Sequence, residues 1–356
     1  MNLAILPLER LLRHPVTSAD GASPAGPVVD RRGRQLLDLR LSVTDRCNFH
    51  CVYCRPHEDG APKSAPAEAS TLLDFPTLTE IARAFVELGV TKVRITGGEP
   101  LLRPKLVTLI EALSRLGIPD LCMTTNGSLL ARNAKALKDA GLKRVTVSLD
   151  AIDELTFRRT TGGATSLPRV LEGIDVARKH GLGPVKINQV VKRGLNDHTV
   201  LAMADWARRE GLELRFIEYM DVGRAHAWRA DDVVTAKEIR QLLQTRWPME
   251  AAPSDDPRAP ATRYRYRDGG GYVGFVASVS EPFCGTCTRA RVTAQGRLHT
   301  CLFSPFGVDL ADVLRNGRDL KRHIQRIWQW REDRYSEFRD QLHPSQVGPE
   351  MIAMGG

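Results

Sequence analysis

The stretch VTKVRITGGEPLLRPKLVTLIEALSRLGIPDLCMTTNG, residues 90–127, decides the fold of this chain. It opens with a β-rich run, Val90–Thr96, continues through a stretch of helical period that ends before Gly117, and closes with a second β-rich run, Leu121–Thr125. Two strands joined through a helix form the βαβ unit of a parallel sheet. The stretch therefore predicts an α/β fold.

The same alternation extends in both directions from this stretch. Short β-rich runs are separated by amphipathic helical stretches, and a glycine stands just after several of the helices. The predicted strands are Leu39–Thr44, Val90–Thr96, Leu121–Thr125, Arg144–Leu149, Val185–Val191 and Leu212–Glu218. Six such units predict an incomplete (α/β)6 TIM-like barrel, although an open doubly wound sheet fits the same order. In either architecture, catalytic residues belong at the carboxyl ends of the strands.

One predicted helix, over Leu78–Leu88, illustrates the helical signal. Its apolar residues recur at helical spacing and share one face. Thr77 and Glu80 form a capping-box pattern, which predicts that the helix begins after Thr77. Gly89 occupies the position after the C-cap, where a left-handed conformation commonly ends a helix.

Composition divides the chain into four predicted parts. The first is rich in Pro, Gly, Ala and Ser and has no hydrophobic period, which predicts flexibility. After about Trp247 the composition changes, and β-like runs at Tyr264–Arg267 and Tyr272–Val279 precede a charged helical region, which predicts a smaller α+β domain. The predicted parts are a flexible leader (1–35), the partial barrel (36–247), the C-terminal domain (248–340) and a tail (341–356) that ends in Gly355-Gly356.

The overall composition of the 356 residues is that of a globular protein. Hydrophobic residues make up 42% and charged residues 26%, which allows a sizeable buried core. No apolar run approaches the ~20 residues that a membrane span requires, and Met1–Leu12 is a poor secretory signal because Glu9 and Arg10 interrupt it. These features predict a cytoplasmic protein. The net charge of +9 suits nucleic acid, anionic lipid or a phosphorylated substrate and does not choose among them.

The seven cysteines fall into two triplets and one single residue. An odd number in a chain without an export signal argues against a disulfide scaffold, and grouped thiols in a reducing compartment favour metal binding. Cys122 lies inside a predicted strand and is expected to be a buried core thiol. The triplets are Cys47-x3-Cys51-x2-Cys54 and Cys284-x2-Cys287-x13-Cys301.

The first triplet follows directly on the first predicted strand. Three thiolates on a short loop can bind three irons of a 4Fe–4S cluster and leave the fourth iron without a protein ligand. An open coordination position suits catalysis, as distinct from a closed structural site. The alternative is a zinc knuckle that His50 or His57 completes.

The second triplet also offers three cysteines and not four. A second 4Fe–4S cluster with an open iron fits this number. A zinc ribbon with His299 as the fourth ligand fits as well, because His299 and Cys301 are two residues apart and would share one face of a strand. Both interpretations stay open on spacing alone.

Two motifs together resemble the radical S-adenosylmethionine (SAM) superfamily. Its CxxxCxxC loop is present with Tyr53 between the last two cysteines, and its GGEP motif is present as Gly97-Gly98-Glu99-Pro100. The resemblance implies that SAM binds the open iron of the first cluster and is cleaved to a 5′-deoxyadenosyl radical. The implied cofactor-binding residues are Tyr53, Gly98, Glu99, Ser148 and Met220.

From about Arg40 to Gly356 the chain resembles the GTP 3′,8-cyclase family of molybdenum cofactor biosynthesis. The matching stretches are 44–49, 94–100, 124–127, 148–150, 215–220, 283–291 and the terminal glycine pair. The resemblance implies conversion of GTP to (8S)-3′,8-cyclo-7,8-dihydroguanosine 5′-triphosphate, an early step of molybdopterin synthesis. The radical would remove hydrogen from C3′ of GTP, and the guanine ring would bind the open iron of the second cluster.

The resemblance also implies roles for individual residues. The implied catalytic residues are Cys47, Cys51, Cys54, Arg289, Arg291, Gly355 and Gly356. The implied metal ligands are Cys47, Cys51, Cys54, Cys284, Cys287 and Cys301. The implied GTP-binding residues are Arg40, Arg94, Thr124, Lys186, Arg215, Arg289, Ala290 and Arg291. Arginines suit a triphosphate because guanidinium groups pair bidentately with phosphate oxygens.

The implied partners are GTP, an electron donor such as flavodoxin, and the downstream cyclic pyranopterin monophosphate synthase. A homodimer is compatible with the resemblance, and neither nucleic acid nor membrane is expected as a partner. Two rival functions stay open, namely another radical SAM enzyme with an auxiliary cluster and a zinc-ribbon protein that binds nucleic acid. The sequence departs from the family pattern at His50, Gln189, Lys192 and the long loop Gly60–Ser70.

Overall fold

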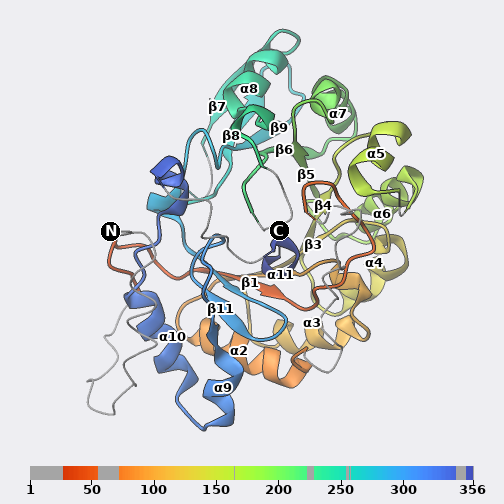
Figure 1. The fold of residues 1–356 in the computed structure, drawn as a ribbon. Helices are drawn as coiled ribbons and strands as arrows, with labels where there is room; N and C mark the ends of the chain where they lie inside the picture. Colours follow the sequence, from red (N-terminus) through yellow and green to blue (C-terminus); the bar gives the residue numbers. More distant parts are fainter. Residues whose placement is uncertain are drawn as a thin grey trace, which may run out of the picture. The chain divides into compact units, whose positions relative to one another are not determined.

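The computed structural model describes residues 27–54, 72–163, 165–222, 228–253, 256, 258–341 and 350–355 (Figure 1). The chain packs as two compact units. Unit 1 takes its residues from Met1–Arg46, Ser64–Cys122 and Cys284–Gly356, and unit 2 from Cys47–Lys63 and Met123–Phe283. The leader up to residue 26, His57, the loop Gly60–Ser70 and Gly356 lie outside the described residues.

Unit 1 contains a sheet with the strand order β12-β11-β10-β1-β2. Its strands are β1 (Asp38–Ser42), β2 (Lys92–Thr96), β10 (Arg289–Val292), β11 (Arg297–His299) and β12 (Val308–Asp309). β1 pairs in parallel with both β2 and β10, whereas β11 and β12 continue the sheet in antiparallel fashion. The register places Arg40 of β1 opposite Arg94 on one side and Arg291 on the other.

Helices cover this sheet, and a short helix is the last element of unit 1. The helices and 3-10 turns are α2 (Phe75–Glu87), η2 (Pro100–Leu102), α3 (Leu106–Ser114), η5 (Cys284–Thr286), α9 (Leu310–Arg315), α10 (Leu320–Gln329), η6 (Tyr335–Glu337), η7 (Arg339–Gln341) and α11 (Met351–Met354). Figure 1 shows α2, α9 and α10 together on one side of β1, with α11 beside β1 near the C-terminus. The C-terminal residues therefore return to the first strand of the unit.

The helix predicted over Leu78–Leu88 is α2, and its apolar face is buried as predicted. Its predicted start is wrong, because the helix begins at Phe75 and Asp74 is the N-cap. The Asp74 carboxylate accepts a hydrogen bond from the Thr77 backbone N–H at 2.9 Å. A proline in the first turn fits this earlier start, since it removes no helical hydrogen bond there. Gly89 adopts the left-handed region as predicted, with φ of +99°.

Unit 2 contains a sheet with the strand order β4-β5-β6-β9-β8-β7. Its strands are β4 (Arg144–Ser148), β5 (Lys186–Val191), β6 (Glu213–Glu218), β7 (Met249–Ala252), β8 (Thr262–Tyr266) and β9 (Tyr272–Val276). β4, β5, β6 and β9 run in parallel, and β8 and β7 follow in antiparallel fashion. β3 (Asp120–Thr125) contributes residues to both units.

Helices follow the parallel strands of unit 2 in the predicted alternation. The helices and 3-10 turns are α4 (Leu130–Asp139), α5 (Glu154–Thr161), α6 (Leu167–Lys179), η3 (Asp197–Thr199), α7 (Val200–Arg209), η4 (Ala230–Asp232) and α8 (Ala236–Gln244). Figure 1 shows α4 to α7 along the outer side of β4 to β6. The helix-facing strand residues, such as Val145, Val147 and Ile187, are fully buried.

The α/β prediction is confirmed, and all six predicted strands are present with bounds that differ by at most two residues. The region 248–340 is divided between the units at Cys284, with β9 joined to β6 and β10 joined to β1. The described part of the predicted leader, 27–35, is packed, since Asp30 and Arg34 are buried. Among the described helices, none is long and apolar enough to cross a membrane.

Candidate active site

The first cysteine triplet lies on the loop after β1, and other residues of unit 2 hold this loop. The His50 backbone N–H donates a hydrogen bond to the Thr161 carbonyl at 3.0 Å. Gly162, with φ of +72°, allows this approach, because a Cβ there would lie 2.9 Å from the His50 Cβ. The loop turns through a hydrogen bond from the Cys54 N–H to the Cys51 carbonyl at 2.9 Å.

Polar side chains just after β3 support the same loop. Asn126 Nδ2 donates to Asn48 Oδ1 at 2.9 Å and lies 3.9 Å from Cys47 Sγ. Asn48 in turn donates to Ser128 Oγ at 3.0 Å. The first cysteine is therefore tied to the carboxyl end of a strand, which is where catalytic residues lie in barrel enzymes.

Asp150, just beyond the carboxyl end of β4, connects the loop to the neighbouring strand. Its carboxylate accepts hydrogen bonds from the Tyr53 hydroxyl and, at 2.9 Å, from the Val190 backbone N–H. Burial raises the pKa of Asp150 to about 6, although both hydrogen bonds oppose the rise. Gln189 donates to the Asp150 carbonyl at 3.0 Å, which explains a polar residue in a strand where apolar residues were expected.

The thiols of the first triplet fit an iron–sulfur cluster. Burial, followed by the Asp150 carboxylate and the thiols of Cys54 and Cys47, raises the pKa of Cys51 well above its usual value. The Cys51 thiol therefore needs a cationic partner in order to become a thiolate ligand, and cluster iron is such a partner.

The GGEP motif belongs to unit 1 and packs against the end of β1. Gly97 has φ of +144°, and a Cβ there would lie 2.3 Å from the Thr44 carbonyl oxygen. The Gly98 N–H donates to the Thr44 carbonyl and the Glu99 N–H to the Arg46 carbonyl, each at 2.8 Å. The Glu99 side chain is fully buried. The motif therefore fixes the backbone directly before the first triplet.

The second triplet belongs to unit 1 and lies on and after η5. Although burial raises it, the Arg289 and Arg331 guanidinium groups lower the pKa of the Cys287 thiol to about 6. Burial, followed by the Asp333 carboxylate, raises the pKa of Cys301 to about 12. Arg289 also donates to the Cys287 sulfur at 3.3 Å. The Cys287 thiol ionises readily beside these guanidinium groups, as iron ligation requires, whereas the Cys301 thiol needs a cation such as cluster iron to become a thiolate.

His299, the fourth ligand in the zinc-ribbon interpretation, faces a neighbouring turn. β11 ends at His299 and Cys301 lies in the bend beyond it, so the predicted shared strand face is wrong. The His299 Nδ1 atom lies 3.2 Å from the Ser304 carbonyl, and a Cβ at Gly307 would lie 2.4 Å from Nε2. Burial lowers the pKa of His299 to about 4. Both ring nitrogens are therefore directed at residues 304–307.

Three arginines form a row across β10, β1 and β2. Arg291, Arg40 and Arg94 occupy paired positions of these parallel strands, so their side chains share one face of the sheet. The next row on this face contains Arg289 beside Asp38. Burial, followed by repulsion from Arg291, Arg94 and Arg289, lowers the pKa of Arg40 well below its usual value. Four guanidinium groups outnumber one carboxylate in these two rows, which favours a bound anion.

The C-terminal tail reaches this row of arginines within unit 1. Arg291 donates to the carbonyl groups of Met354 and Gly355, each at 3.1 Å, and Arg40 donates to the Gly355 carbonyl at 3.4 Å. Gly355 has φ of +68°, and a Cβ there would lie 2.1 Å from Thr96 Cγ2. Both the backbone conformation and the available space therefore require glycine at this position.

Lys186 and Arg215 come together in unit 2 through a shared carboxylate. Glu213 accepts hydrogen bonds from Lys186 Nζ and Arg215 Nε, each at 2.9 Å, and pairs with Arg263 at 3.2 Å. Burial, followed by Arg215, lowers the pKa of Lys186 to about 8, against the opposing effect of Glu213.

The other residues with implied contacts are Thr124 on β3, Ser148 at the end of β4, Met220 just after β6 and Ala290 on β10.

Sequence reasoning missed the residues that support the two triplets. Asn126 and Asp150 lie within stretches that matched the family, so the motifs carried a signal for them. Asp30, Arg331 and Asp333 lie outside every motif, and no local pattern marks them. Their importance emerges only from the tertiary structure.

Two family models match consecutive parts of the chain. The model of the Radical SAM superfamily matches residues 41–207, and that of Molybdenum Cofactor Synthesis C matches residues 212–337. Among solved structures, Streptococcus suis SuiB bound to S-adenosylmethionine is similar, with a TM-score of 0.57 and 15% identity over 91% of this chain and 79% of that chain. This likeness confirms the predicted partial TIM-like barrel with an additional C-terminal part.

Two relatives are similar over most of their length. The GTP 3′,8-cyclase of Acidothermus cellulolyticus is 49% identical over 88% of this chain and 89% of its own length. The GTP 3′,8-cyclase of Xanthomonas axonopodis pv. citri is 48% identical over 93% of this chain and 99% of its own. The chain therefore belongs to the GTP 3′,8-cyclase family, whose members are radical SAM enzymes of molybdenum cofactor synthesis.

Proposed function

We propose that this enzyme converts GTP to (8S)-3′,8-cyclo-7,8-dihydroguanosine 5′-triphosphate and that the row formed by Arg291, Arg40 and Arg94 binds the triphosphate. The row is the observation that carries the proposal, because three guanidinium groups share one face of adjacent strands. Planar guanidinium forks pair bidentately with phosphate oxygens, at about 1.5–3 kcal/mol per charged hydrogen bond. Lys186, Arg215, Arg289, Ala290 and Thr124 are the further proposed GTP contacts.

The cofactors divide between the two triplets in this proposal. Cys47, Cys51 and Cys54 would hold one 4Fe–4S cluster, and Cys284, Cys287 and Cys301 would hold a second. When bound, SAM and the first cluster supply the 5′-deoxyadenosyl radical that removes hydrogen from C3′ of GTP. The proposed SAM contacts are Tyr53, Gly98, Glu99, Ser148 and Met220.

The remaining catalytic task is positional. C3′ has to stay close to C8 of the guanine while the new bond forms, and firm binding of both ends of GTP achieves this. The tail carbonyl groups of Met354 and Gly355 accept hydrogen bonds from Arg291 and Arg40 and so orient these guanidinium groups. The proposed protein partners are an electron donor such as flavodoxin and the downstream cyclic pyranopterin monophosphate synthase.

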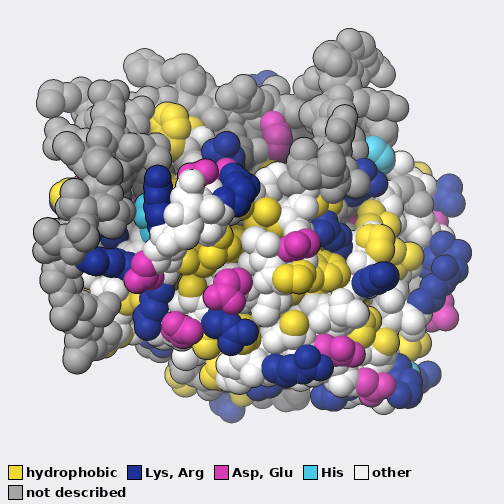
Figure 2. All heavy atoms as spheres, turned by 90° about the horizontal axis from the view of Figure 1, so that it is seen from below, with side chains coloured by type: hydrophobic (Ala, Val, Ile, Leu, Met, Phe, Trp, Pro, Cys, Tyr) yellow, Lys and Arg dark blue, Asp and Glu magenta, His cyan; other side chains and the backbone are white. Residues whose placement is uncertain are grey.

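One face of the molecule bears on the rival function of nucleic-acid binding. Figure 2 shows lysine and arginine side chains on this face interspersed with aspartate, glutamate and hydrophobic side chains. A nucleic-acid-binding protein gathers its basic side chains on one face or along one helix. The coloured part of this face gives that rival no support, whereas the arginine row, in which Arg94 and Arg291 are buried, suits a small anionic substrate.

Metal content tests the proposal of two clusters. After anaerobic reconstitution, the chain is expected to bind about eight irons and eight sulfides, because each triplet serves one 4Fe–4S cluster. Replacing Cys284, Cys287 and Cys301 together with Ala should reduce both numbers to about four. Stoichiometric zinc with little iron, in protein isolated and kept under strict anaerobiosis, would contradict the proposal.

The low pKa of Lys186 predicts a pH dependence of GTP binding. The charged form binds phosphate, so affinity is expected to stay high below the pKa of about 8 and to be lost as pH rises through it. Between pH 7 and pH 9 the dissociation constant should increase by about tenfold. Lys186→Arg keeps its charge and should flatten this profile. Lys135→Arg, a change at an exposed lysine of α4, should leave the pH dependence of GTP binding unchanged. If GTP binding by the wild-type enzyme does not depend on pH in this range, Lys186 does not contact GTP as proposed.

A further inference from the structure

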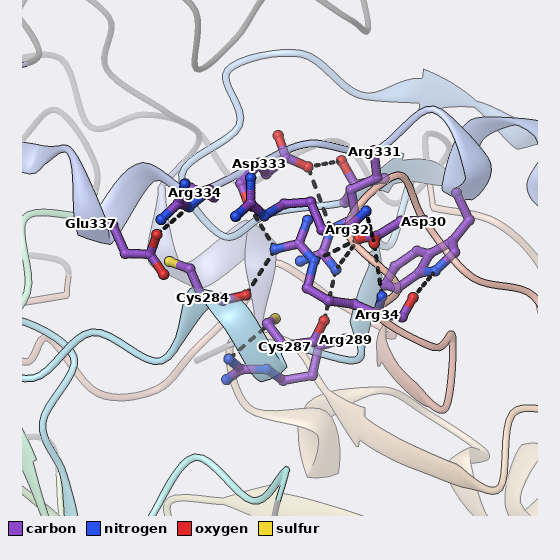
Figure 3. A network of polar contacts seen from close by, with 12 residues as sticks. Asp30, Arg32, Arg34, Cys284, Cys287, Arg289, Arg331, Asp333, Arg334 and Glu337 are labelled. Atoms are coloured by element: carbon purple, nitrogen blue, oxygen red, sulfur yellow. Dashed lines mark hydrogen bonds and ion pairs between the residues drawn. The ribbon is translucent and has the colours of Figure 1, made fainter.

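Two buried arginines hold the backbone of the second cysteine triplet (Figure 3). The Arg34 guanidinium donates to the Cys284 carbonyl at 2.8 Å, and the Arg331 guanidinium donates to the Cys287 carbonyl at 2.7 Å. Each of the two arginine side chains is only 2% exposed. The turn that carries the first two cysteines of the triplet is therefore fixed at both ends by positive charge.

One carboxylate, that of Asp30, holds both arginines. Its Oδ2 atom accepts a hydrogen bond from Arg34 Nε at 2.6 Å and lies 3.4 Å from Arg331 Nη1. Its Oδ1 atom accepts hydrogen bonds from the backbone N–H groups of Arg32 and Arg34, each at 2.9 Å. Asp30 and Arg34 are thereby buried supports of the triplet, although the sequence placed them in a flexible leader.

Asp333 completes the network on the other side of Arg331. Its carboxylate lies 3.5 Å from Arg331 Nε and accepts a hydrogen bond from the Thr300 hydroxyl at 2.6 Å. Its carbonyl accepts a hydrogen bond from Arg34 at 2.8 Å. Thr300 directly precedes Cys301, so the network contacts the chain beside all three cysteines.

The charged groups of this network are not fully matched by hydrogen bonds. Three guanidinium groups, of Arg34, Arg289 and Arg331, accompany three carboxylates, namely those of Asp30, Asp333 and Asp38, the last of which lies beside Arg289. Two buried nitrogens, Arg34 Nη2 and Arg331 Nε, have no hydrogen-bond acceptor in the described part of the chain, although the Asp333 carboxylate lies 3.5 Å from Arg331 Nε. Buried positive charge of this kind calls for a negatively charged neighbour. A 4Fe–4S cluster bound by thiolates is one, and its potential depends on nearby charge and hydrogen bonds.

We propose that Arg331 is a positioning residue for the second cluster, which fixes Cys287 and stabilises the reduced form of the cluster, while Asp30 limits that stabilisation. This role rests on the proposed function, which assigns a cluster to the second triplet. The electron that reduces the cluster adds one negative charge. A buried guanidinium group favours that change and a buried carboxylate opposes it.

A redox titration of the second cluster tests this role. The full chain with Cys47, Cys51 and Cys54 replaced by Ala leaves only the second cluster to be followed by electron paramagnetic resonance. Arg331→Met is expected to leave about tenfold less reduced cluster at a given potential, a shift of about 59 mV to more negative values for a one-electron couple. Asp30→Asn removes the opposing charge and is expected to shift the potential to more positive values.

Opposite shifts distinguish this role from a merely structural one, which predicts that both variants lose iron alike. Arg331→Lys retains the charge without the guanidinium fork and should lie between wild type and Arg331→Met. Arg31→Met is the matched control, because Arg31 pairs with Glu332 at the protein surface, where its side chain is 42% exposed. It should change neither the potential nor the iron content.

The possible results test separately the role of Arg331 and Asp30 and the presence of a cluster at the second triplet. Iron bound with potentials that are unshifted, or that shift in the same direction in Arg331→Met and Asp30→Asn, would overturn the inference alone. If Arg331→Met retains no iron, the potentials of the other two variants test the inference. Asp30→Asn should then shift to more positive values and Arg331→Lys to more negative values than wild type, and any other result would overturn the inference. A chain with the intact network that binds no iron in this background would overturn the second cluster and the inference together.

Discussion

Replacing Cys287 with Ala is expected to abolish GTP cyclisation while a substantial part of SAM cleavage remains. In the proposed division, the second triplet serves the substrate and the first triplet serves radical formation. Without its anchor, GTP no longer holds C3′ where the radical forms, and such loss of position reduces a rate on the order of a thousandfold. A single anaerobic assay that follows both 5′-deoxyadenosine and cyclised nucleotide measures the two effects.

Two matched variants frame this result. Cys47→Ala removes a ligand of the proposed first cluster and should abolish both products. Cys122→Ala alters a thiol that is fully buried in β3 and lies away from either triplet in sequence. It should change the yield of neither 5′-deoxyadenosine nor the cyclised nucleotide. Cyclisation at nearly the wild-type rate in Cys287→Ala would rule out the substrate-anchoring role of the second triplet.

Gly355→Ala is expected to reduce cyclisation about a hundredfold, because small displacements of positioning groups have effects of that size. The added methyl group would lie 2.1 Å from Thr96 Cγ2 in a backbone conformation that disfavours side chains. The tail would have to leave, and Arg291 and Arg40 would lose their carbonyl acceptors. Deleting Gly355 and Gly356 should have the same effect, with the clusters, the fold and much of GTP binding intact.

Gly317→Ala is the control for backbone strain alone. Gly317 also has positive φ, +60°, but no atom lies within 4 Å of its Cβ position. This variant should retain nearly full cyclisation. If the truncated chain also turned over GTP at the full rate, the tail would be an inert end.

The parallel core was predictable because its signal is local. Strands such as Val90–Thr96 are short β-rich runs between amphipathic helices, and this alternation is typical of a parallel sheet. The two cysteine triplets were visible in the sequence because Cys47, Cys51 and Cys54, and likewise Cys284 and Cys287, lie within a few residues of one another, and that each triplet binds a cluster stays a prediction. Gly97, whose backbone conformation favours glycine, belongs to a motif that the sequence already showed.

The supports of the sites were not predictable, because they depend on pairings between distant segments. Asp30 and Arg331 are three hundred and one residues apart in sequence, yet their side chains form a fully buried pair. The start of α2 was misplaced for a different reason, since two cap patterns overlap and Asp74 provided the actual N-cap. The position of Cys301 was misjudged because a strand was extended past His299, where the chain bends.

The fate of the hydrogen at C3′ of GTP tests most directly whether this enzyme cyclises GTP through a radical at that carbon. The measurement is anaerobic turnover with SAM, a reductant and GTP that carries deuterium at C3′, followed by mass spectrometry of both products. If the radical removes hydrogen from C3′, 5′-deoxyadenosine acquires one deuterium per molecule and the cyclised nucleotide loses the label. Unlabelled 5′-deoxyadenosine beside a nucleotide that retains its deuterium would contradict this proposal.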